Sequence, residues 1–99
     1  MGDDNGELLL ELGQSLCIAE VEGARQRFLE ALAGGTGLAL DGAALERIDA
    51  AGVQTLVSLV ATARRDGVTW SWRAASEDLR AAATLLGVAE PLGLERMEG

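Results

Sequence analysis

The chain has 99 residues, of which 16 are acidic and 8 basic, and its formal net charge at pH 7 is −8. A negative charge of this size repels nucleic acid and anionic membranes, so neither is expected as a partner. The length predicts one domain over residues 1–99, with a core from about 7 to 94. With no histidine and a single cysteine, Cys17, the chain forms no internal disulfide and no Cys/His metal cluster.

The N-terminal segment Met1-Gly2-Asp3-Asp4-Asn5-Gly6-Glu7 lacks the basic region and apolar core of a secretory signal. No apolar run approaches the roughly 18 to 20 residues that a membrane span requires. We therefore expect a cytoplasmic protein that does not insert into a membrane.

In residues 7–12, Leu8, Leu10 and Leu12 fall on one side and Glu7 and Glu11 on the other, which predicts a half-buried strand. Gly13-Gln14 predicts a turn, and residues 15–18 predict a second strand that pairs back to form an N-terminal hairpin. Cys17 lies in this second run and is expected to be a small buried hydrophobe.

Residues 20–33 predict the first helix, because their apolar side chains recur at three- and four-residue spacing. These apolar positions are Val21, Ala24, Phe28, Ala31 and Leu32. The glycines at 34, 35 and 37 end the helix. A phosphate-binding loop would need a lysine and a following helix, and neither is present, so no nucleotide site is expected here.

The apolar run 38–40 predicts a central strand, and residues 50–65 predict a long helix. Asp49 precedes this helix as its N-cap, since a short carboxylate accepts hydrogen bonds from the free N–H groups of a first turn. Gly52 in that turn allows another backbone to approach closely. The inward stripe of the helix is expected to be Val53, Leu56, Val57, Val60 and Ala61.

Residues 68–73 alternate as a further strand, with Val68, Trp70 and Trp72 on its inner face. Ser76 is the expected N-cap of a third helix, which Gly87 ends. The inward positions of this helix are expected to be Leu79, Ala82, Ala83 and Leu86.

Pro91 is expected to prevent the third helix from continuing. Leu92 and Leu94 are expected to anchor a last turn before a frayed tail at residues 93–99. The alternation of strands and helices predicts an α/β fold in which helices cover a mixed sheet of four to five strands.

These residues resemble the STAS domain family, named after sulfate transporters and anti-sigma factor antagonists. The family signature is an apolar strand ending in Asp, here LALD at 38–41, followed by Asp-Ser-Ser-Gly or Asp-Thr-Ala-Gly at the start of a helix, here IDAAG at 48–52. Residues 63–88 resemble the second half of the family, and the resemblance covers about 7 to 94. Within the family the chain looks most like short stand-alone members that accompany bacterial chemotaxis genes. The resemblance implies a STAS fold and a regulatory module that binds other proteins.

Ala50 is the main departure from the family pattern. In the anti-sigma factor antagonists the residue after the motif Asp is a Ser or Thr that a partner kinase phosphorylates. The hydroxyl is absent here, so Ala50 is interpreted as a degenerate phosphosite.

The resemblance also implies where a partner would bind. The expected contact positions are Asp49, Ala50, Ala51, Gly52, Val53 and Gln54, flanked by Ala19, Glu20, Ala75 and Ser76. The expected partner is an anti-sigma factor or serine kinase-like protein, or a chemotaxis signalling protein.

Catalysis is not expected, because without His, Tyr or Lys the available bases are carboxylates. Asp41, Glu46 and Asp49 lie close in sequence, but their spacing matches no metal motif, and no cofactor is expected. Other functions remained open on the sequence. One is the cytoplasmic STAS subunit of a phospholipid-trafficking ABC transporter, which binds the ATPase. Others are a homodimer formed through an apolar patch at Val53 and Leu56, and a binder of a small ligand.

Overall fold

A computed structural model describes residues 7–34 and 37–94. The elements follow one another as β1 (Leu8–Glu11), β2 (Ser15–Leu16), α1 (Val21–Gly34), β3 (Leu38–Gly42), β4 (Arg47–Ile48), α2 (Ala50–Arg65), β5 (Trp70–Ala75), α3 (Glu77–Leu85) and α4 (Ala89–Leu92). The predicted α/β fold is confirmed, and the three long helices lie within two residues of their expected positions.

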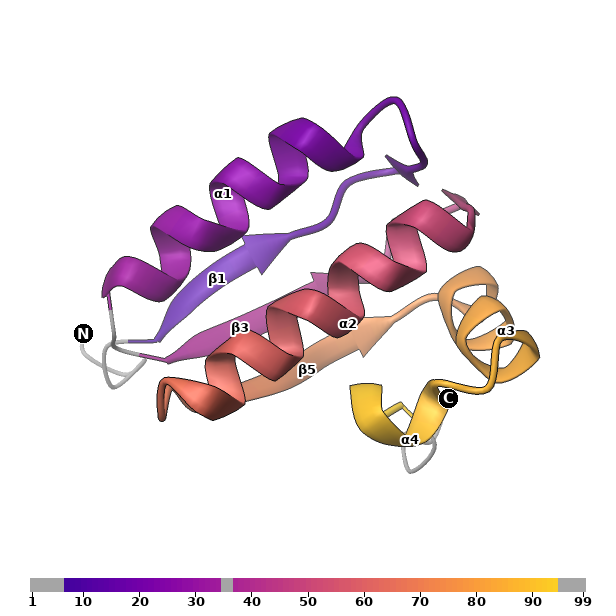
Figure 1. Cartoon of the computed structure of the whole chain (residues 1–99). Helices are drawn as coiled ribbons and strands as arrows, with labels where there is room; N and C mark the ends of the chain where they lie inside the picture. The colour runs from indigo at the N-terminus through magenta and orange to yellow at the C-terminus, as the bar shows by residue number, and fades with distance from the viewer. Residues whose placement is uncertain (1–6, 35–36, 95–99) are drawn as a thin grey trace.

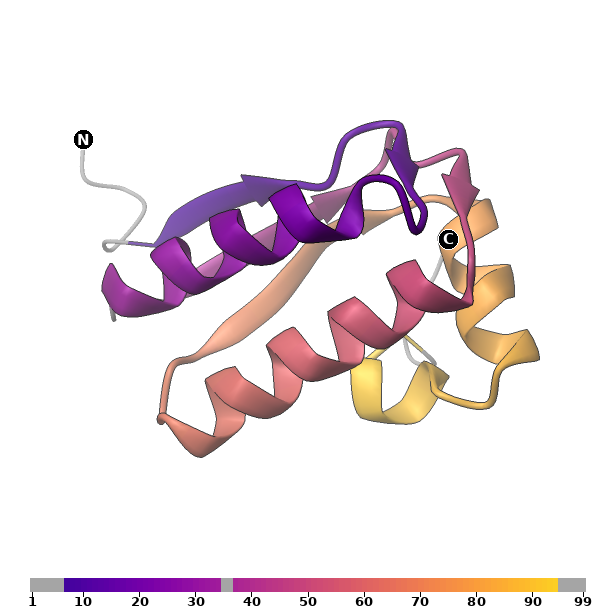
Figure 2. The same cartoon turned by 45° about the horizontal axis from the view of Figure 1, so that its top comes forward.

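The main sheet has three parallel strands in the order β1-β3-β5. Its central strand β3 is buried as predicted, because Leu38 and Leu40 have no exposed surface and α1 and α2 run side by side across one face of the sheet (Figure 1, Figure 2). Both crossover connections are helices, which is the usual way to join neighbouring parallel strands.

The predicted N-terminal hairpin and mixed sheet are wrong. β1 pairs with β3, while β2 pairs in parallel with β4 in a separate two-stranded sheet. Gly13, with a φ of 79°, redirects the chain, and the Gln14 carbonyl then accepts hydrogen bonds from the N–H groups of Glu46 (2.8 Å) and Arg47 (3.1 Å). These bonds hold the chain beside β4, and Gly-Gln is not one of the dipeptides that favour a tight hairpin.

The buried stripe of α2 differs from the predicted one at four positions. Leu59 and Ala63 are buried, whereas Val57 is half-buried and Ala61 is exposed. The reason is that α2 packs against α1 as well as the sheet, so its covered surface turns toward α1.

The C-terminal part closes the end of the sheet where β5 finishes (Figure 1). Ser76 is the N-cap of α3 as predicted, since its Oγ accepts a hydrogen bond from the Leu79 N–H at 3.1 Å. The indole Nε1 of Trp72 donates a hydrogen bond to the Leu92 carbonyl at 2.8 Å and so ties α4 to the sheet.

The expectation for Leu86 is wrong, since this residue is 43% exposed. α3 ends at Leu85, before Pro91 as expected, and the buried Leu92 and Leu94 anchor a last turn. Pro91 lies in the first turn of the separate helix α4, which accepts proline because its N–H groups have no helical partner. Leu94 is buried, so the chain does not fray at residue 93, and residues 95–99 lie outside the described part. In the described part, no helix is long and apolar enough to cross a membrane.

Gly52 tests how tightly the start of α2 is packed. A Cβ added there would overlap the carbonyl oxygen of Leu16, which is backbone and cannot turn away. We expect Gly52→Ala to lower the free energy of unfolding by an amount near the upper end of the about 1–3 kcal/mol typical of overpacking, measured by urea denaturation.

The matched control is Gly23→Ala in α1, where an added Cβ would meet nothing within 4 Å. This change should leave the free energy of unfolding unchanged or raise it by about 0.5 kcal/mol, since alanine favours the helix. Equal stability for both variants would contradict the close contact at Gly52.

Candidate functional site

Asp49 links the start of α2 to the loop between β2 and α1. Its Oδ1 accepts a hydrogen bond from the Gly52 N–H at 2.9 Å, which is the predicted N-cap. Its Oδ2 accepts a second one from the Ile18 N–H at 3.0 Å. One carboxylate therefore holds together two segments that are 31 residues apart in the sequence.

These bonds also change the acidity of the side chain. The N–H groups of Gly52 and then Ile18 favour the charged form of the carboxyl, so the pKa of Asp49 lies below its ordinary value. The carboxylate stays ionised at neutral pH, and it faces the favourable end of the α2 dipole.

The expected contact residues divide into surface and interior positions. Ala50 and Gln54 are exposed, and Asp49 and Ala51 are half-buried. Gly52 and Val53 are buried, so their assignment as partner-contacting residues is corrected. Both lie on the side of the first turn of α2 that packs inward, where Gly52 fits against the Leu16 carbonyl.

The expected apolar patch at the start of α2 is also absent, because Val53 and Leu56 both have no exposed surface. The stripe that these two residues share covers the core. The patch on which self-association was expected therefore does not exist at this helix.

Ala19 and Glu20 lie on the loop that Asp49 holds in place, and both are exposed. The Glu20 carboxylate accepts hydrogen bonds from the Cys17 N–H at 2.8 Å and the Ser15 hydroxyl at 3.0 Å. These bonds fix the shape of the loop, which thus forms one surface with Asp49 and Ala50. Cys17 is half-buried, not fully buried as predicted.

Ala75 and Ser76 are half-buried at the end of β5. Ser76 has a structural role, since its N–H donates to the Gly42 carbonyl at 3.0 Å and its hydroxyl caps α3. They lie at the same end of the sheet as the start of α2 (Figure 1, Figure 2), and α3 contacts β4 there. Ala75 and Ser76 are therefore neighbours of the loop and helix start that Asp49 joins, and the N–H and hydroxyl of Ser76 already have hydrogen-bond partners within the fold.

Ile18 is the surface residue that the sequence did not reveal. Its side chain is 70% exposed, although the apolar run Leu16-Cys17-Ile18 predicted a strand residue. The strand ends at Leu16, and Ile18 projects from the turn that leads into α1. We call the surface formed by Ile18, Ala19, Glu20, Asp49 and Ala50 the capping surface.

The other carboxylates of this region do not gather into a site. Asp41 accepts a hydrogen bond from the Ala43 N–H at 3.0 Å and so shapes the turn after β3. Within residues 7–34 and 37–94, no group of three or more metal-ligating side chains is placed to hold an ion.

Comparison with known families identifies the fold. A family model described as "Mlab, STAS domain" matches residues 3–96. The chain belongs to the STAS domain family. Members of this family are protein-interaction modules. Asp49 and Ala50 of the capping surface belong to the segment Asp49-Ala50-Ala51-Gly52. No curated protein matches the chain.

The geometry explains the roles of three motif positions in this STAS domain. Asp49 caps α2, Gly52 admits the Leu16 carbonyl, and Ala50 presents a methyl group to solvent. Thr55 carries a hydroxyl nearby on the same helix. This hydroxyl donates a hydrogen bond to the Ala51 carbonyl at 2.8 Å and is therefore already engaged.

The lowered pKa of Asp49 leads to a prediction on stability. Because the carboxyl has a lower pKa in the folded state than in the unfolded chain, its stabilising effect is present above about pH 4. The effect is lost as the pH falls through the folded-state pKa. Asp49→Asn keeps a capping side chain but removes this charge. We expect the stability difference between wild type and Asp49→Asn to shrink as the pH is lowered, measured by urea denaturation.

Glu30→Gln is the control, because Glu30 is an exposed carboxylate in the middle of α1. It should give a smaller difference at neutral pH and little change with acidification. If the stability of Asp49→Asn stayed parallel to that of wild type at every pH, the two N–H bonds would not be favouring the charged carboxylate.

Proposed function

We propose that this STAS domain is a regulatory module of the anti-sigma factor antagonist type that binds a protein partner through the capping surface. The observation that supports this proposal best is the exposed Ile18 side chain, whose backbone N–H is bound to Asp49, the residue before Ala50. An isolated aliphatic side chain on a rigid turn is a suitable anchor for a pocket on a partner.

The charges around Ile18 indicate what that pocket would look like. Glu20 and Asp49 flank the isoleucine, and the chain as a whole carries a net charge of −8. A partner with an apolar pocket and a basic rim would complement this surface and would be steered toward it.

Ala50 removes phosphate control from the proposed interaction. A phosphate here would add about −1.5 to −2 charges beside Ile18, and the cost of desolvating this charge against an apolar pocket would oppose binding. The methyl group keeps this STAS domain permanently in the form that corresponds to the unphosphorylated state. We propose a role in bacterial chemotaxis or another two-component pathway, in the cytoplasm, without phosphate control at position 50.

A second candidate is the cytoplasmic STAS subunit of a phospholipid-trafficking ABC transporter. The family model that matches the chain carries "Mlab" in its description, which favours this candidate. The capping surface would then bind the transporter ATPase. Affinity purification of the tagged protein from its native host separates the two, since one predicts an ABC ATPase and the other a signalling kinase or chemotaxis protein.

The contribution of Ile18 can be measured once that partner is purified. We expect Ile18→Ala to weaken binding by about 1–2 kcal/mol, because it removes an apolar anchor at the centre of the contact. Ala50→Glu should weaken binding by about 1 kcal/mol or more, because the added carboxylate would lose its hydration against the apolar pocket that receives Ile18. Isothermal titration calorimetry gives both values.

Leu85→Ala is the matched control for these variants. Leu85 is 84% exposed and is the last residue of α3, a helix that contributes no residue to the capping surface. Its truncation should leave the affinity unchanged. A larger loss for Leu85→Ala than for Ile18→Ala would move the interface to α3.

The absence of phosphate control is tested separately. Incubated with ATP and the serine kinase encoded nearest its gene, the wild-type protein should take up no phosphate, measured by intact mass. Ala50→Ser restores a hydroxyl at the family position and is expected to become a substrate of a kinase of this type. Stoichiometric phosphate on residues 49–55 of the wild type would contradict the proposal.

A further inference from the structure

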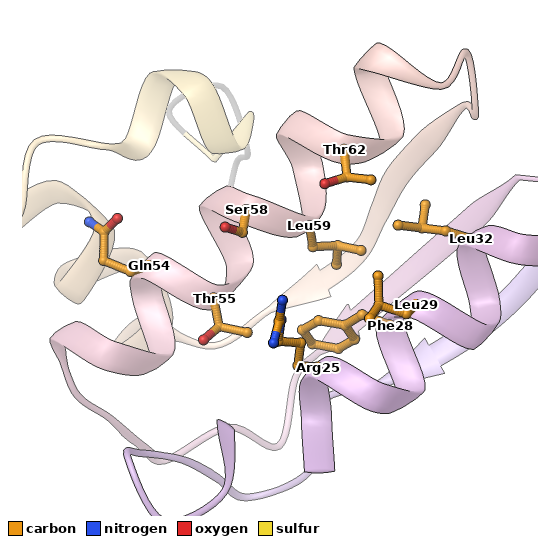
Figure 3. Close-up of a pocket in the computed structure, with 9 residues that line it drawn as sticks. All are labelled: Arg25, Phe28, Leu29, Leu32, Gln54, Thr55, Ser58, Leu59 and Thr62. Atoms are coloured by element: carbon orange, nitrogen blue, oxygen red, sulfur yellow. The ribbon is translucent and has the colours of Figure 1, made fainter. Parts of the chain in front are cut away.

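A groove of about 370 Å³ runs between α1 and α2, separate from the capping surface (Figure 3). Its floor is apolar, because Phe28, Leu32 and Leu59 reach it and are buried. Arg25 and Leu29 form the rim on α1, and Leu29 is 51% exposed. The volume falls within the range of about 300–1,000 Å³ that is usual for small-molecule sites.

The one charge of the lining, that of Arg25, lies at one end of the groove, and Thr62 lies at the other end near Leu32 (Figure 3). α1 and α2 run in the same direction (Figure 1), so Arg25 near the start of α1 lies level with Thr55 near the start of α2. Figure 3 shows the Arg25 guanidinium pointing into the groove toward Thr55, with Leu29 and Leu32 farther along beside Leu59.

The charge of the lining differs from that of the whole chain. The chain has 16 acidic residues, yet the lining contains one arginine and no carboxylate. Within residues 7–34 and 37–94, Arg25 makes no hydrogen bond or ion pair. A guanidinium with free donors above an apolar floor is complementary to a carboxylate that carries an aliphatic body.

We propose that this groove binds a small amphipathic carboxylate. The carboxylate of the ligand binds the Arg25 guanidinium at one end of the groove, and its aliphatic chain packs on Phe28, Leu32 and Leu59. The size of the site favours a small molecule, since sites for such ligands usually enclose about 300–1,000 Å³. This inference is independent of the proposed function, because it uses a different surface.

Hexanoate is the probe, and 1-hexanol is its uncharged counterpart of equal chain length. Each is titrated at neutral pH into ¹⁵N-labelled protein and followed by the backbone amide resonances. We expect hexanoate to shift amides near the groove, such as those of Leu29 and Ser58. We expect 1-hexanol to bind at the same place about tenfold more weakly, because a charge-assisted hydrogen bond is lost.

Arg25→Gln tests the anion contact. Arg25 is exposed, so the variant should fold, and its amide spectrum verifies this. We expect it to weaken hexanoate about tenfold and to leave 1-hexanol unchanged. Arg64→Gln removes the same charge from an exposed position at the end of α2 outside the groove, and it should change neither affinity.

Ser58→Leu tests the location independently of charge. Ser58 is an exposed residue of the lining, and a leucine there would fill the groove and weaken both ligands equally. The proposal is overturned if hexanoate shifts no groove amide, or if Arg25→Gln and Arg64→Gln weaken it to the same extent. Equal binding of hexanoate and 1-hexanol would also overturn the assignment of a carboxylate ligand.

Discussion

The paired hydrogen bonds of the Asp49 carboxylate are the interaction on which the functional end of this protein depends. One oxygen begins α2 and the other holds the turn before α1. A single side chain binds both segments, so this side chain alone sets the position of the start of α2 relative to the turn before α1. The capping surface is a direct consequence of this geometry.

Gly52 allows β2 and α2 to come close together on the buried side of the same region. The Leu16 carbonyl lies where any side chain at position 52 would begin, so β2 and α2 approach as closely as two backbones can. The motif Asp-Ala-Ala-Gly is therefore two structural residues that enclose two small ones. The structural pair sets the position of the helix, and of the small pair Ala50 is exposed and Ala51 half-buried.

α2 serves two surfaces of opposite character. Its first residues belong to the capping surface, where carboxylates surround an exposed isoleucine. One turn later the helix lines a groove that has an arginine and no carboxylate. Both surfaces include residues of α2, yet none of the residues that line the groove belongs to the capping surface, so the two proposed ligands would not compete for a contact residue.

The sequence alone determined the features that depend on neighbours within one turn or strand, namely the caps at Asp49 and Ser76, the helix end at Gly87, and the STAS family itself. Tertiary structure decided that β2 pairs with β4, that Val53 is covered, and that Ile18 is exposed. The physical reason is that periodicity tells which side chains share a face, whereas burial depends on which distant segment packs on that face. Val53 is covered because it packs into the core, and Ile18 is held in its turn by Asp49, which is 31 residues away in the sequence. No local pattern records either relation.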